Sequence, residues 1–380
     1  MRFPEDVPTL TDGVVSLRAH AEADVQALYE QAVDAVMLRW TTVPDPSTRE
    51  TAREFACEII PDGWREDREW AFAVEAPDED GAARFVGTVS LRNERHGRAE
   101  IAYGAHPWAR GRGYVARALE LLLDWGFRER DVRTVIWWAN KGNWASRKVA
   151  WRLGFSFDGT VREWLPQRGD LKDGWVGVLT SGDERRPRNR WFDAPRVTGS
   201  RVVLRGYRDA DAARIVAACS DERTAYWLPH LPSPYTLNDA YEFLESRREQ
   251  RASGKGVSWA VADPDTDDLV GQISVFDLDE HGDAEVGYWT HPSARGKGVM
   301  TEACRLVVRH CFIDEEDGGL GLRRLHAIAS ADNPASQHVL EANGFVRTGM
   351  LRQENPHRDG TFSDTVTFDL LRNEYAAPGG

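Results

Sequence analysis

The sequence predicts an α/β protein made of two homologous domains in tandem, each built on a mixed sheet. Three observations support this prediction. The second half of the 380 residues restates the first, strand-like and helix-like segments alternate within each half, and a short glycine-rich turn joins a strand to a helix at the same place in both. A chain of 380 residues is long enough for two or three domains of about 150 residues each.

The internal repeat is long and continuous. The segment VSLR at 15–18 corresponds to VVLR at 202–205, an offset of 187, and AEIAY at 99–103 corresponds to AEVGY at 284–288, an offset of 185. Offsets that drift by only a few residues indicate small loop insertions within one fold. A period this long excludes a solenoid and indicates two copies of one domain.

We expect the domains at 1–182 and 197–380, with a linker at 183–196. The stretch 181–190 is polar and contains chain-breaking residues, as linkers do. Its four arginines allow a nucleic-acid contact as the alternative interpretation. The net charge of −13, from 48 basic and 61 acidic residues, disfavours nucleic acid and favours a solvated linker.

The elements of each half follow in a fixed order. In the first half we expect strands and helices in this order: a strand at 14–18, helices at 21–37 and 48–60, strands at 70–75, 85–92 and 100–105, a helix after the turn, a strand at 134–138, a helix at 145–153, and strands at 156–163 and 175–179. The helix after the turn repeats Leu119, Leu122, Leu123 and Phe127 at helical spacing, which predicts a core-facing side.

The turn itself indicates an anion site. It reads Arg110-Gly111-Arg112-Gly113 in the first half and Arg295-Gly296-Lys297-Gly298 in the second. The first N–H groups of a helix lack internal partners, and glycines allow a phosphate to approach them closely. Each half therefore offers a candidate seat for a pyrophosphate.

Other interpretations of the turn remain open. Neither copy has the Walker pattern of a nucleotide-binding loop. Gly111-x-Gly113-x-x-Ala116 imitates a dinucleotide fingerprint, but Thr301 breaks it in the second copy, and the turn follows several elements rather than the first strand. A purely structural turn is the remaining alternative.

The segment AEVGYWTHPSARGKGVMTEA at 284–303 resembles the GNAT acetyltransferases, specifically their RimJ/RimL-type branch. Asn333-x-x-Ser336 before Gly344-Phe345 resembles a second signature of that branch, and the first half has the same order. The resemblance covers nearly the whole chain, twice. It implies a tandem GNAT fold and an N-acetyltransferase that moves acetyl from acetyl-CoA to a primary amine by direct attack. Because no apolar signal segment follows Arg2, we expect a cytoplasmic protein.

The resemblance also implies where CoA binds. The strands ending at 103–105 and 288–290 would splay from their neighbours, and a backbone N–H there would polarise the thioester carbonyl. The implied CoA-binding residues are Gly104, Ala105, Arg110, Gly111, Arg112, Gly113, Tyr114, Val115 and Asn143 in the first half, and Trp289, Thr290, Arg295, Gly296, Lys297, Gly298, Val299, Met300 and Asn333 in the second. Val115 and Met300 depart from the small residue of the family pattern. Their side chains are tolerated if they point away from the ligand; the alternative is that they crowd the pantetheine and weaken a site.

Catalytic roles are implied for two residue types. Glu100 and Glu285 precede the turn at matching positions, and we expect them to act as the bases that deprotonate the amine; a structural carboxylate is the alternative. Ser146 and Ser336 are expected to protonate the CoA thiolate, the alternative being local backbone bonding at a helix end. The asparagines three residues earlier are typical helix N-caps.

The acceptor is left open by the sequence. It can be a small-molecule amine or a protein N-terminus, because acceptor loops vary freely on one fold. Trp137 and Trp138 must face opposite sides of a strand, so one can line a pocket for an amine, with ordinary packing as the alternative.

Several partners are not expected. No apolar run approaches the roughly 18 residues that a membrane helix needs, and the four cysteines form no CxxC pair, so we expect neither membrane insertion nor a metal site. The two halves are expected to pack as an internal pseudo-dimer. Two other hypotheses remain: that only one half is catalytic, or that the chain is a CoA-binding module without catalysis.

Overall fold

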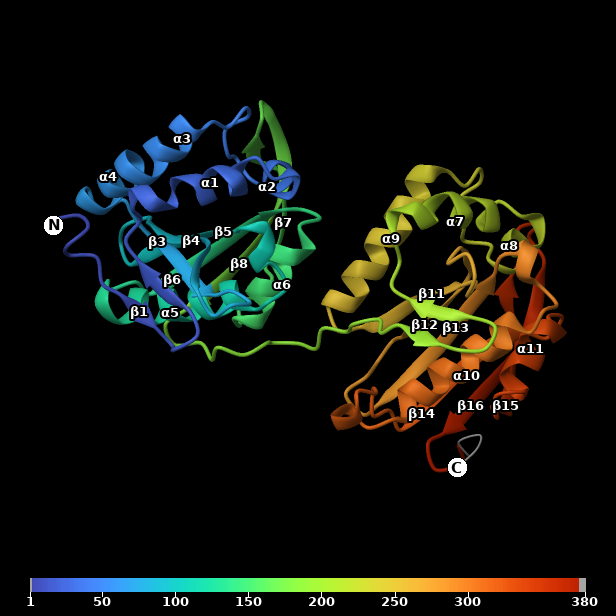
Figure 1. Cartoon of the computed structure of the whole chain (residues 1–380). Coiled ribbons are helices and arrows are strands. Elements are labelled where there is room, and N and C mark those ends of the chain that lie inside the picture. The colour runs from blue at the N-terminus through green and yellow to red at the C-terminus, as the bar shows by residue number, and fades with distance from the viewer. Residues whose placement is uncertain (1, 376–380) are drawn as a thin grey trace. The chain divides into compact units, whose positions relative to one another are not determined.

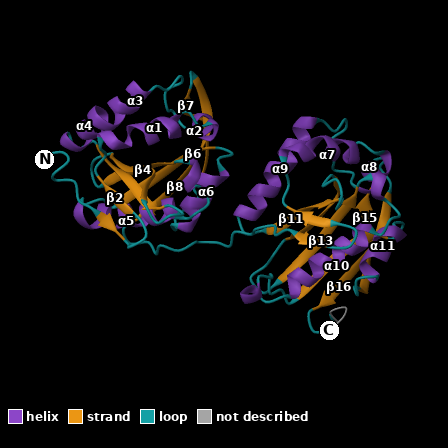
Figure 2. Ribbon diagram, in the orientation of Figure 1, coloured by secondary structure: helices purple, strands orange, loops and turns teal. Residues whose placement is uncertain are grey.

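The computed structural model describes residues 2–375, and the chain folds as two compact units, Met1–Arg188 and Asn189–Gly380 (Figure 1). Each unit contains one eight-stranded mixed sheet with helices on both of its faces (Figure 2). The predicted fold class, two α/β domains in tandem, is confirmed. The point of division lies inside the segment 183–196.

The helices and strands of the first unit are these: β1 (Leu10–Thr11), β2 (Ser16–Arg18), α1 (Val25–Ala32), α2 (Ala35–Trp40), α3 (Arg49–Glu54), α4 (Ile60–Arg65), β3 (Glu69–Pro77), β4 (Ala83–Asn93), β5 (Arg98–Ala105), α5 (Tyr114–Glu129), β6 (Thr134–Asn140), α6 (Trp144–Arg152), β7 (Gly159–Gln167) and β8 (Asp170–Thr180).

The second unit repeats the plan with these: β9 (Val197–Thr198), β10 (Val203–Arg205), α7 (Ala212–Cys219), α8 (Glu222–Trp227), α9 (Leu237–Ala252), β11 (Gly256–Ala262), β12 (Leu269–Phe276), β13 (Asp283–Thr290), α10 (Val299–Phe312), β14 (Arg324–Ser330), α11 (Pro334–Glu341), β15 (Val346–Pro356) and β16 (Phe362–Leu371).

The two sheets have the same topology. The strand order is β1-β2-β3-β4-β5-β6-β8-β7 in the first and, reversed, β9-β10-β11-β12-β13-β14-β16-β15 in the second. Each sheet contains one parallel pair, β5 with β6 and β13 with β14, and all its other pairs are antiparallel. A parallel pair needs a crossover, which α5 and α10 supply.

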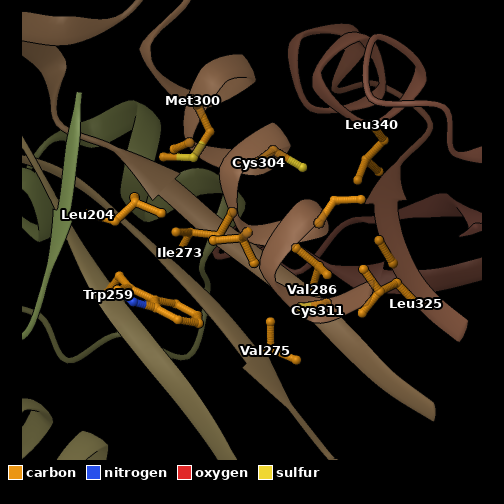
Figure 3. Close-up of a cluster of buried hydrophobic side chains, with 14 of the residues drawn as sticks. Leu204, Trp259, Ile273, Val275, Val286, Met300, Cys304, Cys311, Leu325 and Leu340 are labelled. Atoms are coloured by element: carbon orange, nitrogen blue, oxygen red, sulfur yellow. The ribbon is translucent and has the colours of Figure 1, made fainter. Parts of the chain in front are cut away.

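The larger part of each core lies between the sheet and this crossover helix. In the second unit the strand residues Trp259, Ile273 and Val286 pack with Cys304 and Met300 of α10 (Figure 3). Smaller clusters lie under α1 and α3 in the first unit and under α7 and α9 in the second. Each sheet is therefore fixed from both faces, with its parallel pair at the centre.

The helices before β3 differ from the expectation. The predicted helix at 21–37 is interrupted, because the Asp34 side chain accepts the N–H groups of Val36 and Met37 and starts a new helix, α2. The predicted helix at 48–60 continues to Arg65 through a π-helical turn at Phe55–Ile59. The second unit has one uninterrupted helix, α9, at this place.

A buried ion pair ties β10 to the turn that precedes α7. The Arg205 guanidinium donates to both carboxylate oxygens of Asp211, at 2.9 and 2.8 Å, and both side chains are 5% exposed. The hydrogen-bonded Asp211 carboxylate raises the pKa of Arg205. Arg18 and Asp24 form the equivalent pair in the first unit, at 2.8 and 2.7 Å, but Arg18 is 28% exposed.

Asp211→Asn should destabilise the second unit by about 3 kcal/mol, because it leaves a buried guanidinium with reduced compensation. The Arg205 Nε also donates to Asp267 at 3.2 Å, so the loss of stability should lie at the lower end of the range for a broken buried ion pair. The measurement is urea unfolding of the full chain by circular dichroism. Asp24→Asn is the matched control and should cost less, since Arg18 reaches solvent; an equal loss in both variants would contradict this account.

Candidate active sites

The central parallel strands separate in both units. β5 and β6 pair from Arg98 opposite Thr134 to Ile101 opposite Trp137, and both strands then continue without pairing to each other. β13 and β14 pair only from Asp283 opposite Arg324 to Glu285 opposite His326. The splay that the resemblance implied is confirmed, and each sheet has an opening at its centre.

Backbone N–H groups line one side of each opening. The His106 N–H donates to the Val86 carbonyl oxygen on β4 at 2.7 Å. Because N–H directions alternate along a strand, the N–H groups of Tyr103 and Ala105 face the opening, while that of Gly104 faces β4. The His291 N–H donates likewise to Val270, so the equivalent groups in the second unit are those of Tyr288 and Thr290.

The glycine-rich turns lie beside these openings and start α5 and α10. Gly113 and Gly298 are the N-cap residues, with φ of 79° and 71°, and Gly111 and Gly296 also have left-handed φ, of 75° and 73°. A Cβ at Gly111, Gly113 or Gly296 would meet nothing within 4 Å, whereas one at Gly298 would lie 3.0 Å from Arg201. An open cradle of backbone N–H groups fits a diphosphate.

The basic side chains of the turn have two different surroundings. Arg112 and Lys297 are exposed, and Arg112 contacts Glu79 at 3.1 Å. Arg110 and Arg295 are half-buried and form ion pairs with the N-cap aspartates of α2 and α8, Asp34 and Asp221. They therefore fix these helices to the turn, whereas Arg112, Lys297 and, in the second unit, Arg201 are exposed beside it.

The side chains at the first helical positions point into the protein. Met300 is 5% exposed within the core of the second unit (Figure 3), and Val299 is buried beside it. Val115 packs against the core of the first unit, and the Tyr114 hydroxyl donates to the Pro77 carbonyl. These side chains pack against the protein, and the first backbone N–H groups of each helix have no partner within the helix.

A pair of hydroxyl groups lies on the α6 side of the first opening. The Tyr103 oxygen is 2.8 Å from the Ser146 Oγ, and the Trp137 indole N–H donates to both oxygens, at 3.2 and 3.0 Å. In the second unit the Tyr288 oxygen is 3.1 Å from the Ser336 Oγ. Each serine hydroxyl thus contacts a tyrosine. Asn143 and Asn333 accept the serine N–H groups at 3.2 Å, as N-caps do.

No role was predicted for the two tyrosines from the sequence. Burial raises the pKa of Tyr103 to about 12, and it raises the pKa of Tyr288 as well, so both phenols stay protonated at neutral pH and can donate. A tyrosine at the same place in both copies was the signal available in the sequence. Its contact with the serine, 43 or 48 residues away, required the fold.

The two glutamates lie on the opposite face of the sheet from these hydroxyls. Ala99 and Ile101 point into the core on the α5 side, so the intervening Glu100 points to the other face. Burial raises the pKa of Glu100 and of Glu285. Glu100 accepts a hydrogen bond from Arg92 at 3.0 Å, whereas the Glu285 Oε2 lies 3.6 Å from the His326 Nε2.

A model of one protein family, described as an acetyltransferase (GNAT) domain, matches this chain twice, at residues 15–156 and 201–346. The chain belongs to the GNAT acetyltransferase family. Members of this family transfer acetyl groups from acetyl-CoA, and the paired matches agree with the two sheets.

This GNAT chain is similar over about half of its length to several acetyltransferases. It is 31% identical over 180 residues to the uncharacterized N-acetyltransferase YoaA of Bacillus subtilis, covering 47% of this chain and 97% of that protein. It is 28% identical over 178 residues to the putative ribosomal N-acetyltransferase YdaF of the same organism, covering 46% and 93%. A solved structure titled a probable acetyltransferase is 28% identical, covers 48% of this chain and 99% of its own, and has a TM-score of 0.43.

Trp137 and Trp138 of this GNAT chain point to opposite faces of the sheet, as alternation along a strand predicts. Trp137 is 1% exposed in the core. Trp138 points to the glutamate face, where its ring is stacked on that of Trp164 with the ring centroids 6.0 Å apart.

Within residues 2–375 no group of three His, Cys, Asp or Glu side chains is placed to hold a metal ion. None of the helices in that range is both long and apolar enough to cross a membrane.

Proposed function

We propose that each half of this chain is an N-acetyltransferase site that moves an acetyl group from acetyl-CoA to a primary amine. The observation that carries this proposal is the opening between the parallel strands, present in both halves. It has a glutamate on one face, a tyrosine–serine hydroxyl pair on the other, and a glycine cradle beside it. A small amine or a protein N-terminus is the acceptor.

The donor would be held mainly by the backbone. The N–H groups at the start of α5 and α10, with Arg112 and Lys297, would bind the CoA diphosphate. The strand edges at 103–105 and 288–290 would pair with the pantetheine arm, and the N–H groups of Ala105 and Thr290 would polarise the thioester carbonyl. Acetyl-CoA supplies an acetyl group activated as a thioester.

The residues on the two faces would handle two different protons. Glu100 and Glu285 would accept the proton of the acceptor ammonium, directly or through a water. On the opposite face Ser146 with Tyr103, and Ser336 with Tyr288, would donate a hydrogen bond or proton to the departing thiolate. Because the acid and the base lie on opposite faces, they would not neutralise each other.

The test is a turnover assay of the full chain. Acetyl-CoA is supplied with a panel of small primary amines and short peptides, and free CoA is detected by its thiol. Release of CoA together with an acetylated amine supports the proposal. Tight CoA binding without product across the panel would contradict it and favour the binding module.

Tyr103→Phe combined with Tyr288→Phe should lower kcat by about 100-fold, because general acid catalysis contributes at least that much. CoA affinity, measured by calorimetry, should stay unchanged, since the ring remains. Tyr241→Phe, at an exposed position of α9, is the matched control. An unchanged kcat in the double variant would show that the phenols do not serve the leaving group.

A further inference from the structure

The glutamate faces of the two sheets can be compared position by position. On β6 and β8, Ile136 pairs with Val178 and Trp138 with Val176. On β14 and β16, His326 pairs with Asp369 and Ile328 with Thr367. Because Glu100 is opposite Ile136 and Glu285 is opposite His326, these pairs occupy equivalent places beside the two glutamates.

One more position can be matched through the backbone. Glu163 and Gln353 both have left-handed φ, of 49° and 52°, and both donate their N–H to an aspartate of the neighbouring strand. The next residue is Trp164 in the first unit and Glu354 in the second. The aromatic ring in one half is therefore replaced by a carboxylate in the other.

The face of the first unit is apolar on the β6–β8 side of its glutamate, whereas Arg92 and Glu69 lie on the β4–β3 side. Ile136, Val176 and Val178 are half-buried, Trp138 is stacked on Trp164, and Trp164 is 56% exposed. The charged groups that act on Glu100 are Arg92, which lowers its pKa, and the carboxylates of Glu94 and Glu69, which raise it. An apolar floor with an exposed aromatic edge favours an aromatic group on the acceptor, since stacked rings attract one another.

The face of the second unit is polar and rich in carboxylates on the β14–β16 side of its glutamate, whereas Phe276 lies opposite Glu285 on β12. Burial raises the pKa of Glu285, the carboxylates of Asp277 and Glu354 raise it further, and His326 opposes them. Asp283 and Asp369 are already paired with Arg324, at 2.6 and 3.2 Å.

Glu354 differs from these paired carboxylates. Its side chain is exposed and accepts the Thr365 hydroxyl at 2.6 Å. A carboxylate that is accessible near Glu285 suits a second cationic group on the acceptor.

We propose that the two halves divide their acceptors: the second half acetylates amines that carry a second cationic group, held by Glu354, and the first half acetylates amines attached to an aromatic group, packed against Trp138 and Trp164. The inference rests on the proposed function. It deepens that function by assigning a substrate class to each half.

The first experiment compares matched acceptors on the full chain: 1,4-diaminobutane against butylamine, and 2-phenylethylamine against ethylamine. Glu354→Gln should lower kcat/KM for diaminobutane about fivefold, the value of one exposed ion pair, and leave butylamine and phenylethylamine unchanged. Trp164→Ala should lower kcat/KM for phenylethylamine about tenfold and leave diaminobutane unchanged. Glu316→Gln, at an exposed position of the 3₁₀ turn Glu315–Asp317, is the control.

The second experiment measures binding without acetyl transfer. Phenylethylamine should quench tryptophan fluorescence in the full chain and much less in Trp164→Ala. Calorimetry should show diaminobutane binding that weakens in 0.5 M NaCl and in Glu354→Gln.

The outcomes separate the two proposals. If no amine releases CoA while these binding differences hold, the proposed function fails and the assignment of ligands to the two faces stands. If CoA is released but neither variant changes its acceptor ratio, the division of acceptors is overturned and the proposed function stands.

Discussion

The double variant Glu100→Gln, Glu285→Gln should lose acetyl transfer by about 10²–10⁴-fold at saturating acetyl-CoA, the usual contribution of a positioned base. The amide keeps the size of the side chain but cannot accept the ammonium proton. Each single variant should lose only the acetyl-transfer activity of the half that carries the substitution. The measurement is kcat by thiol detection, with diaminobutane and phenylethylamine as acceptors.

The pH dependence gives a second readout for the same residues. Burial raises the pKa of Glu100 and of Glu285, and a base works only when deprotonated. The rate of the unaltered chain should therefore fall as the pH decreases through these raised pKa values, at a higher pH than an ordinary glutamate would show. The residual rate of the double variant should lack this acidic limb.

Glu120→Gln and Glu316→Gln are the controls, one exposed glutamate in each unit away from the openings. Neither should change kcat or its pH profile. A double variant of Glu100 and Glu285 with kcat within about twofold of the unaltered chain, or with the acidic limb intact, would assign proton removal to another group or to water.

Gly111→Glu and Gly296→Glu should each remove one of two CoA sites. Both glycines have left-handed φ with open space at the Cβ position, so a glutamate would strain the turn and place a carboxylate at the proposed diphosphate site. Like charges in contact cost several kcal/mol. Calorimetric titration with CoA should give two sites per chain before substitution, one in each single variant and none in the double variant.

Gly318→Glu is a matched control for this strain. Gly318 is exposed, has φ of 82° and would meet nothing within 4 Å, but it ends a short 3₁₀ turn at Glu315–Asp317 instead of starting a helix. It should keep both sites. Two sites in the double variant of Gly111 and Gly296 would show that the diphosphate binds elsewhere.

Much of the fold could be predicted because its signals are local or repeated. The offsets between the halves fixed the domain plan, and the glycines of the turn reflect a φ that other residues rarely adopt. Alternation along a strand placed Trp137 and Trp138 on opposite faces. The resemblance to GNAT proteins, rather than any pattern of hydrophobic residues, predicted that the central strands would splay.

The remaining features depend on contacts between residues distant in sequence. Arg110 was expected at the phosphate seat, but its partner Asp34 lies 76 residues earlier. Asp34 also acts as the N-cap of α2. This N-cap interrupts the single helix that the hydrophobic spacing at 21–37 predicted. The different glutamate faces appear only once the strand register is known, since alternation does not say which strands are neighbours.

The separated central strands leave a gap in each sheet that is open to an added strand. Beyond Ile101 and Trp137 in the first sheet, and beyond Glu285 and His326 in the second, the two central strands do not pair with each other, and main-chain N–H and C=O groups bind available partners. A ligand arm that fills the gap would become part of the architecture, and its binding energy would add to the folding energy by mass action. The melting temperature of this chain should therefore rise as acetyl-CoA or CoA binds, and binding in each half should stabilise that half.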